Sequence, residues 1–573
     1  MSRHPSRTTT TIAPSVRAEV AVVLAEWERG RLSRRSVLRR AAALGISGAA
    51  LAMLVGQAAP GRAAAAVLRA AQDDPSAGTL GGILRVATIG EPPHLDEHQS
   101  TAELIAVLGY CAYEGLFTYD ADYQPIPELV ETHTVSDDGL THTMTLRQGV
   151  TFHNGEPLTA ADAIASVERW GRISGVGTRL MEKTAELAEI DDATIEFRLN
   201  EPYGTILIAL AHNTQACTIH PRSILEAAGD DPITDETMYI GTGPYRLAEW
   251  RRDAAMRFER FDEYQSAPGE APVGYGGRKY AYADAIEFIP VPDEAARVAG
   301  LQAGDYQLAL DIGNDQYEVL NGAPGIIAEI LTPTNWDVFF LNWRSPMMGN
   351  LAMREAVQAA FDHRPMLQSG RGGDDFIRLD PGLMMQQTPW HSTAGEERYD
   401  VNDPDLARAK LEEAGYAGEP LRFLATQEYS YMYGEAIVAQ QQLEAVGITV
   451  DLQVTDWATV LEQRADPEAW DMFVTGHGFV PDPSQISYVG QMNQYPGWWS
   501  SEESLALAAS LLAGSDFDER KATFDEIQTA HYTEIPAIKI GDSSNVSYRS
   551  DTVGGWDGQF ERGIKFWNLW LNG

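Results

Sequence analysis

The stretch Gly115–Trp170 constrains the fold more than any other part of the chain, because its local signals follow one another in a consistent order. Asp137-Asp138-Gly139 is typical of a turn, and apolar residues then alternate with polar ones over Met144–Phe152, which is the period of half-buried strands. Asn154-Gly155 predicts a tight reversal. Thr159–Trp170 combines an N-cap threonine, an acidic partner three residues later and a helical apolar face. The stretch therefore predicts strands, a turn and a capped helix.

These segments resemble the family 5 extracellular solute-binding proteins of ATP-driven importers, which include dipeptide, oligopeptide and nickel binders. Five family motifs occur in register within about 50 residues. The matching segments are Tyr113-Glu114-Gly115-Leu116, Ser136–Gly139, Leu146–Val150, Phe152–Gly155 and Ala160–Ala163.

The resemblance extends over about residues 80–573. Gly241-Thr242-Gly243-Pro244 matches a motif in which two glycines and a proline set a backbone path that side chains could not follow. Further matches are Pro292–Asp305, Met353–His363 and Leu443–Ile448. Ile83–Ile89, at the start of the matching region, predicts a strand that is buried on both faces, as in a parallel sheet.

The resemblance implies an α/β type II periplasmic-binding-protein fold, in which two α/β lobes joined by a hinge carry an extra subdomain (three-lobed, cluster C-like). A chain of 573 residues exceeds what one core normally serves. The predicted parts are an export signal and linker (1–78), lobe I (79–118, 241–312 and 536–573), the extra subdomain (119–240) and lobe II (313–535).

The N-terminal region predicts export from the cytoplasm. Basic residues of Ser33–Arg40 precede the uncharged apolar run Ala41–Val55, which is the pattern of a signal peptide. As a helix, these 15 residues would rise only about 22 Å, less than the roughly 30 Å hydrocarbon core of a bilayer. Arg34-Arg35 resembles a twin-arginine signal, although Val37 stands where phenylalanine is commonest. We expect a periplasmic or other extracytoplasmic location in the cell envelope.

The charge of the chain narrows its partners. The formal net charge is −39, so phosphate backbones and anionic membranes are repelled, and nucleic acid is excluded as a partner. Cys111 and Cys217 are the only cysteines. An oxidising compartment would allow one disulfide, and two unpaired thiols are the equal alternative.

The sequence contains no catalytic motif of the nucleophile-elbow, zinc-protease, phosphate-loop or paired-cysteine kind. His94, Asp96 and His98 lack a third spaced ligand, so a loop at a cleft edge is a better interpretation than a metal site. We therefore predict a binding protein without enzymatic activity, metal or cofactor.

The anchors for a standard dipeptide are missing. Peptide-binding members of the family hold the ligand ammonium on an aspartate ahead of a step that corresponds to Asp482-Pro483, and this position falls on Phe479 or Val480 here. The arginine that would pair with the ligand carboxylate is expected within Thr426–Tyr431, which contains none. Charge-assisted hydrogen bonds are typically the strongest polar contacts, so a dipeptide held in the standard way is disfavoured.

Aromatic residues fill segments that face the cleft in the family, and stacked rings suit a sugar, an aromatic compound or an apolar peptide side chain. Core packing is the alternative for each ring, and a turn or N-cap role is the alternative for Asp482. We expect replacement of Trp498 or Phe479 by alanine to weaken binding and leave the fold intact. The candidate ligand-binding residues are Trp336, Trp457, His477, Phe479, Asp482, Tyr495, Trp498 and Trp499.

The sequence thus predicts an exported, monomeric protein that captures a peptide or peptide-like solute between its lobes and delivers it to the permease and ATPase subunits of an ABC importer. The twin-arginine export machinery would be a further partner. An oligosaccharide or another uncharged solute is the first alternative. An enzyme or a signalling receptor on the same scaffold is the alternative from another class.

Overall fold

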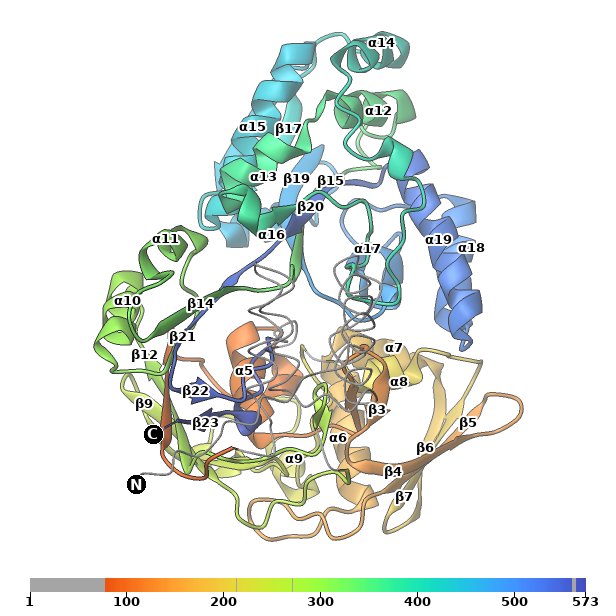
Figure 1. The fold of residues 1–573 in the computed structure, drawn as a ribbon. Coiled ribbons are helices and arrows are strands. Elements are labelled where there is room, and N and C mark those ends of the chain that lie inside the picture. Colours follow the sequence, from red (N-terminus) through yellow and green to blue (C-terminus); the bar gives the residue numbers. More distant parts are fainter. Residues whose placement is uncertain (1–77, 213, 270–271, 559–562, 573) are drawn as a thin grey trace, which may run out of the picture. The chain divides into compact units, whose positions relative to one another are not determined.

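The computed structural model describes residues 78–212, 214–269, 272–558 and 563–572. The predicted export signal therefore lies outside the described residues, apart from its last position. The chain divides into two compact units, and the larger, Leu80–Val553 with Gly558–Leu571, contains the three main sheets (Figure 1). Among the described helices, none is long and apolar enough to cross a membrane.

Seven strands form the first sheet, in the order β14-β21-β13-β1-β12-β9-β8. The central strand β1 pairs in parallel with both β12 and β13, and it buries Leu84 and Val86 on one face and Ala87 on the other. This confirms the predicted parallel strand, although the second face is buried only at Ala87, because Ile83 is half-buried and the Arg85 side chain is 42% exposed. The strands are β1 (Ile83–Thr88), β8 (Tyr245–Arg251), β9 (Ala255–Arg260), β12 (Ala285–Pro290), β13 (Leu308–Ala309), β14 (Ile326–Ile330) and β21 (Val546–Ser550). The helices of this region are α5 (Glu103–Ala112), α10 (Glu294–Ala303) and α11 (Tyr317–Leu320).

The two glycines ahead of β8 pass too close to the end of α5 for any side chain. A Cβ on Gly241 would lie 2.1 Å from the carbonyl oxygen of Ala112, and one on Gly243 would lie 2.6 Å from the carbonyl carbon of the same residue. Between them, the Thr242 hydroxyl donates a hydrogen bond of 3.0 Å to the Glu114 carboxylate. The structure confirms that this path requires glycine, and it joins two of the sequence motifs directly.

Four antiparallel strands, in the order β4-β5-β7-β6, form the second sheet. They are β4 (Val130–Val135), β5 (Thr141–Leu146), β6 (Thr184–Asp191) and β7 (Thr194–Leu199), with the helices α6 (Ala160–Ile173), α7 (Gly175–Lys183), α8 (Ile206–Leu210) and α9 (Arg222–Ala228). At the start of α6, Thr159 and Asp162 form a reciprocal capping box, and Trp170 on the same helix is buried in the core. The capped helix is confirmed. The predicted strand region is confirmed only as far as Leu146, where β5 ends, because the residues up to Phe152 form a turn and one isolated bridge from Thr151 to Pro157.

Six strands form the third sheet, in the order β16-β20-β15-β19-β17-β18. They are β15 (Asn335–Leu341), β16 (Ile377–Arg378), β17 (Leu421–Thr426), β18 (Val450–Thr455), β19 (Met472–Gly478) and β20 (Ala537–Ser543). The helices of this region are α12 (Leu351–Ala360), α13 (His363–Arg371), α14 (Pro404–Ala414), α15 (Ser430–Val446), α16 (Trp457–Gln463), α17 (Ser487–Gly490), α18 (Glu502–Ala513) and α19 (Phe517–Glu534).

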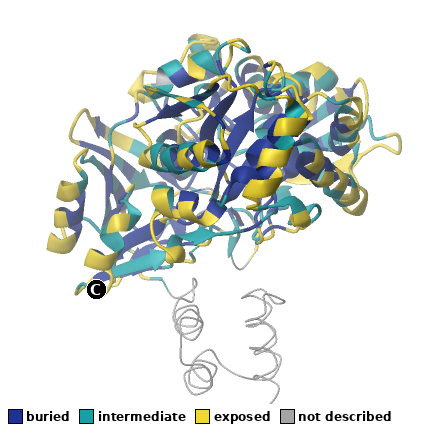
Figure 2. Cartoon of the chain, turned by 90° about the horizontal axis from the view of Figure 1, so that it is seen from above, coloured by how far each residue is buried: buried dark blue, intermediate teal, exposed yellow. Residues whose placement is uncertain are grey.

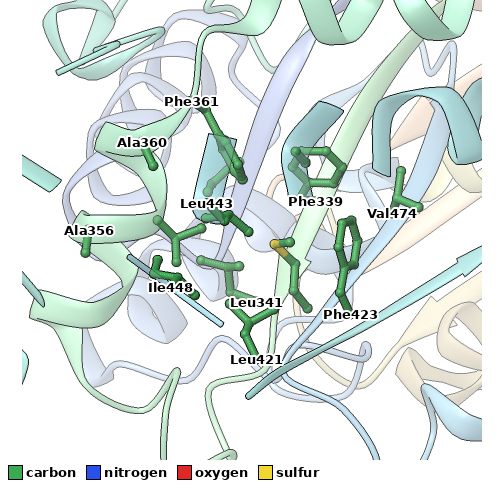
Figure 3. Close-up of a cluster of buried hydrophobic side chains, with 14 of the residues drawn as sticks. Phe339, Leu341, Ala356, Ala360, Phe361, Leu421, Phe423, Leu443, Ile448 and Val474 are labelled. Atoms are coloured by element: carbon green, nitrogen blue, oxygen red, sulfur yellow. The ribbon is translucent and has the colours of Figure 1, made fainter. Parts of the chain in front are cut away.

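Alternation along β15 divides its side chains between two cores, because successive residues of a strand point to opposite faces. Phe339 and Leu341 join the core under α12–α15, and Figure 3 shows Phe339 beside Phe423 there. Val338 and Phe340 join the core on the opposite face, with residues of α17, α18 and α19. Figure 2 shows buried residues along the strands and exposed residues on the outer faces of helices. A sheet covered on both faces is the layering expected of an α/β fold.

The chain passes twice between the first and third sheets. Residues 331–334 connect β14 to β15, and residues 544–545 connect β20 to β21. The two connections run together, since the Leu331 amide donates to the Asn545 carbonyl at 2.9 Å. β14 lies after residue 313, where lobe II was predicted to begin, but it pairs in the first sheet. β20 lies after residue 536, where lobe I was predicted to resume, but it pairs in the third sheet. The domain boundaries themselves stay predictions.

The remaining elements are short. They are β2 (Phe117–Tyr119), β3 (Pro125–Pro127), β10 (Pro272–Val273), β11 (Gly276–Gly277), β22 (Val553–Gly554), β23 (Trp570–Leu571) and the 3₁₀ helices η2 (Glu97–Gln99), η3 (Glu236–Met238), η4 (Asn314–Gln316), η5 (Asp374–Phe376), η6 (Glu396–Arg398), η7 (Pro483–Gln485) and η8 (Phe566–Asn568). Cys111 and Cys217, for which a disulfide and free thiols were both open, are buried free thiols, and burial raises the pKa of each.

Candidate ligand-binding site

A cavity of about 380 Å³ lies between two groups of residues that are far apart in the sequence. We call them the α7 wall and the β19 wall, because α7 carries Gly175, Val176 and Arg179 of the first group and β19 carries His477 and Gly478 of the second. The α7 wall consists of Thr101, Gly175, Val176, Arg179, Tyr203, Thr205, Ile208, Ala209, His212, Thr214 and Gln215. The β19 wall consists of His477, Gly478, Phe479, Val480, Ser484, Gln485, Ser487, Gly490, Gln491 and Leu512.

His477 is held as a neutral ring at the end of β19. Its Nδ1 lies 2.9 Å from the Gly478 carbonyl oxygen, and its Nε2 lies 3.3 Å from the Ser487 amide, which donates to it. This pair of partners requires the proton on Nδ1. Burial lowers the pKa of His477, and the Trp336 ring stacks against it at 4.7 Å. The imidazole is therefore a fixed, uncharged part of the wall.

Phe479 and Gln485 line the same wall and contact residues far from it in the sequence. The Phe479 ring packs against Tyr123 at 4.7 Å. The Gln485 amide lies 3.3 Å from the Tyr119 hydroxyl oxygen and 3.2 Å from His212 Nδ1. The hydrogen bond from Gln485 to His212 therefore joins the two walls directly, whereas Tyr119 and Tyr123 do not line the cavity.

Asp482 does not line the cavity. Its two carboxylate oxygens accept hydrogen bonds of 2.9 and 2.8 Å from the Arg520 guanidinium. Its Oδ1 also accepts from the Ser484 amide at 2.9 Å, which caps η7. Asp482 and Arg520 are both buried. The carboxylate is thus used within the protein, in the capping role that was the alternative to ligand contact.

Trp498 and Trp499, which were predicted to bind the ligand, do not line the cavity. Trp498 is buried and packs against Trp470, with ring centroids 5.8 Å apart. Trp499 is buried and its Nε1 donates to the Glu534 carboxylate. Long-range packing with α19 and the third sheet places these rings, and the local sequence contains no sign of it.

Three further predicted residues also lie outside the cavity lining. Trp336 is buried behind His477. Tyr495 packs against Phe340 with centroids 5.2 Å apart, and Trp457 packs edge to face against Tyr429 at 5.4 Å. Of the eight predicted residues, His477 and Phe479 line the cavity and the other six do not. Ligand contact by any of the eight stays a prediction.

An arginine does reach the region where the sequence showed none, but it comes from α13. The Arg371 guanidinium lies 3.4 Å from the Tyr431 ring centroid, and its Nε donates to Asp337 at 2.8 Å. The buried carboxyl group of Glu435 lies in the same cluster, and burial together with Asp337 raises its pKa. Asp337 therefore occupies this guanidinium, and Arg371 does not line the cavity.

Most residues of the α7 wall were not predicted from the sequence. Arg179, Tyr203 and His212 line the cavity, yet they lie in no motif and in no segment expected at the cleft. Arg179 could have been placed on the face of α7 that also carries Gly175 and Val176, since residues three and four apart are neighbours on a helix. No local signal shows that this face borders a cavity.

No group of three or more histidine, cysteine, aspartate or glutamate side chains among the described residues could hold a metal ion. Asp96 pairs with Arg169 at 2.7 Å, and His98 Nε2 lies 2.9 Å from the Thr218 carbonyl oxygen. These two side chains serve internal contacts. Both are buried and neither lines the cavity, so their predicted place in a loop at the cleft edge is not confirmed. A cavity of about 380 Å³ between two walls has the size and concave form that small-molecule sites usually have.

The family model for bacterial extracellular solute-binding proteins, family 5 (middle), matches residues 124–497. The chain belongs to this family, and its fold is that of the type II periplasmic binding proteins. It is a solute-binding protein and not an enzyme, as predicted.

Two curated relatives and one solved structure illustrate the similarity. A probable peptide ABC transporter periplasmic-binding protein of Sinorhizobium fredii is 26% identical over 484 residues, which cover 80% of this chain and 88% of that protein. The glutathione-binding protein GsiB of Salmonella typhi is 26% identical over 485 residues, which cover 81% and 89%. The ABC transporter substrate-binding protein CtaP of Listeria monocytogenes has the same fold, with a TM-score of 0.72, 20% identity and coverage of 86% and 100%.

Proposed function

We propose that this protein captures a peptide or peptide-like solute in the cavity between the α7 and β19 walls and delivers it to an ATP-driven ABC importer. The observation that carries the proposal is this cavity of about 380 Å³ in a member of the solute-binding family. The peptide and glutathione binders among its relatives support the solute class. Its residues Arg34-Arg35 support export by the twin-arginine machinery to the periplasm, where it acts as a monomer.

The chemistry of the walls suits a small peptide-like molecule. Pockets for small molecules usually measure about 300–1,000 Å³ and combine apolar surface with a few placed polar groups. Here Phe479, Ile208 and Val176 offer apolar surface, whereas Gln491 offers an amide that can donate and accept, and Gln485 offers its carbonyl oxygen as an acceptor. The backbone amides and carbonyls of a peptide need partners of this kind.

Closure about the two connections between the first and third sheets would make the bound state recognisable to a permease. Only residues 331–334 and 544–545 link those sheets along the chain. Hydrogen bonds from Asn314 to the Ser544 carbonyl and from Gln387 to the Pro333 carbonyl, at 3.0 and 2.8 Å, hold the connections in the present arrangement. A ligand drives such a hinge motion only through contacts that it makes better in the closed form.

Isothermal titration calorimetry with two panels, peptides of two to five residues and small oligosaccharides, tests the proposal. We expect a peptide to bind with a dissociation constant of about 1 μM or below, which corresponds to about −8 kcal/mol. Val176→Trp should fill the cavity and abolish binding. Val319→Trp, on an exposed face of α11, should leave binding unchanged. Binding of sugars alone, hydrolysis of the peptide, or full affinity in Val176→Trp would contradict the proposal.

A further inference from the structure

The cavity has an unusual charge for this protein. The chain contains 82 acidic residues, yet no aspartate or glutamate occurs among the described residues that line the cavity. Arg179 is the one lining residue with a permanent charge. Inside an otherwise strongly acidic molecule, the described lining therefore offers a positive group and no negative one.

Arg179 has no ion-pair partner among the described residues, and this distinguishes it from the other basic residues of α6 and α7. An arginine on so acidic a protein normally has carboxylates within reach. The other basic residues of α6 and α7 all have one: Arg169 pairs with Asp96, Arg172 with Asp230 and Lys183 with Glu201. Arg179 is thus the basic residue of these helices whose charge is left available, and it is the one that lines the cavity.

The guanidinium of Arg179 lies over the first turn of α7. Its Nη1 is 4.0 Å from the position that a Cβ on Gly175 would occupy, and Gly175 itself lines the cavity. A guanidinium presents its N–H groups in a planar fork that matches the two oxygens of a carboxylate. A ligand carboxylate in the cavity would find this partner without displacing an internal one.

A ligand ammonium group would find no such partner. Asp482, the acidic residue next to the β19 wall, is bound on both oxygens by Arg520 and does not line the cavity. His477 is neutral and both its ring nitrogens are used. Removing an ammonium group from water without a compensating negative charge is costly, so a free amine inside the cavity is disfavoured.

We propose that the cavity selects peptide-like solutes that carry a free carboxylate, bound by Arg179, and whose amino group is acylated or absent. N-acyl amino acids and N-acyl peptides are the substrate class with this chemistry. The inference rests on the proposed function and specifies which end of the solute the protein recognises.

Calorimetry with the dipeptide Ala-Phe in four end states tests the selection: the free zwitterion, the N-acetyl acid, the free-amine amide and the N-acetyl amide. We expect the N-acetyl acid to bind about tenfold or more tightly than either amide, and at least as tightly as the zwitterion. In Arg179→Gln, the preference for the acid over the amides should fall to about twofold or less. Lys183→Gln removes the same charge from the same helix without touching the cavity lining, and it should retain the preference.

Three results would overturn the inference while leaving the peptide-binding function in place. They are equal binding of acids and amides, tighter binding of the zwitterion than of the N-acetyl acid by about tenfold, and an unchanged preference in Arg179→Gln. If the wild-type protein binds none of the four compounds although another peptide of the panel binds, the inference fails and the peptide function stands. Binding of no peptide in either experiment overturns both. Circular dichroism of both variants verifies that each is folded.

Discussion

The two walls of the cavity use their charged and polar groups in opposite ways. Next to the β19 wall, Asp482 and Arg520 neutralise each other, and His477 is neutral because both its nitrogens are engaged. In the α7 wall, Arg179 has no ion-pair partner among the described residues. Internal pairs hold one wall in shape, whereas the charge that is free to meet a solute comes from the other. A charged residue near a cleft is therefore informative about ligands only once its partners are known.

The largest effect on stability is expected from removing the carboxylate that pairs with Arg520. Asp482→Ala leaves a buried guanidinium without its carboxylate and removes the cap of η7, so we expect a loss of about 3–5 kcal/mol in the free energy of unfolding. Equilibrium unfolding in urea measures this loss. The fraction that stays folded should bind solute more weakly, because Asp482 caps η7, and Ser484 and Gln485 of this turn line the cavity.

Asp230→Ala provides the matched control for Asp482→Ala. It breaks the Arg172–Asp230 pair, in which both side chains are more than half exposed. Surface pairs contribute about 0–1 kcal/mol, so this variant should unfold almost like the wild type. Equal losses in the two variants would show that the Asp482–Arg520 pair does not support the β19 wall.

A medium effect is expected from pH, through the histidine behind the β19 wall. His531 Nδ1 lies 3.2 Å from the Tyr488 hydroxyl, and burial lowers the pKa of His531 to about 3, with Lys539 acting in the same direction. An unfolded histidine has a pKa of about 6.5, so between these values the unfolded state binds more protons. The contribution of His531 to stability therefore falls as the pH falls from about 6.5 toward 3.

The variant His531→Gln isolates this contribution. Urea unfolding of wild type and variant at pH 7.0 and pH 5.0 should show the wild type losing about 2 kcal/mol more than the variant over this interval. The sign is fixed, because glutamine does not titrate. An equal loss in both proteins would mean that His531 accepts a proton in the folded state as readily as in the unfolded one.

The smallest effect is expected on solute affinity, from a change to an aromatic ring of the β19 wall. Phe479→Leu retains an apolar side chain but removes the ring that packs on Tyr123 and lines the cavity. Contacts of an aromatic ring beyond its buried area contribute about 0.5–1.5 kcal/mol, so we expect solute affinity to fall by about threefold to tenfold. Calorimetry with the N-acetyl acid of Ala-Phe measures this.

Phe517→Leu, on a partly exposed ring that packs against Trp390 outside the cavity lining, is the control for Phe479→Leu and should keep the wild-type affinity. Unchanged affinity in both variants would show that the ring of Phe479 does not touch the solute.

The sequence predicted best what depends on neighbours along the chain. The capping box of Thr159 and Asp162 involves residues three apart, and the need for glycine at Gly241 and Gly243 follows from one short motif. Family resemblance then placed these local pieces in the correct fold.

The site was predicted less well because burial depends on contacts between distant segments. Trp498 and Trp499 look like cleft residues in sequence, but packing with Trp470 and a hydrogen bond to Glu534 place them in the core. Trp498→Ala should therefore cost stability in addition to any effect on binding, in contrast to the expectation from sequence. No motif surrounds Arg179 in the sequence, and only the structure shows that it has no ion-pair partner among the described residues.

A crystal structure of the protein with the peptide-like solute that binds most tightly in calorimetry tests the central claim most directly. We expect the solute to lie between the α7 and β19 walls, against His477 and Phe479, with its carboxylate within hydrogen-bonding distance of the Arg179 guanidinium. A solute bound elsewhere on the protein, or bound in this cavity with its carboxylate away from Arg179 and its amine paired with an acidic side chain, would contradict the account.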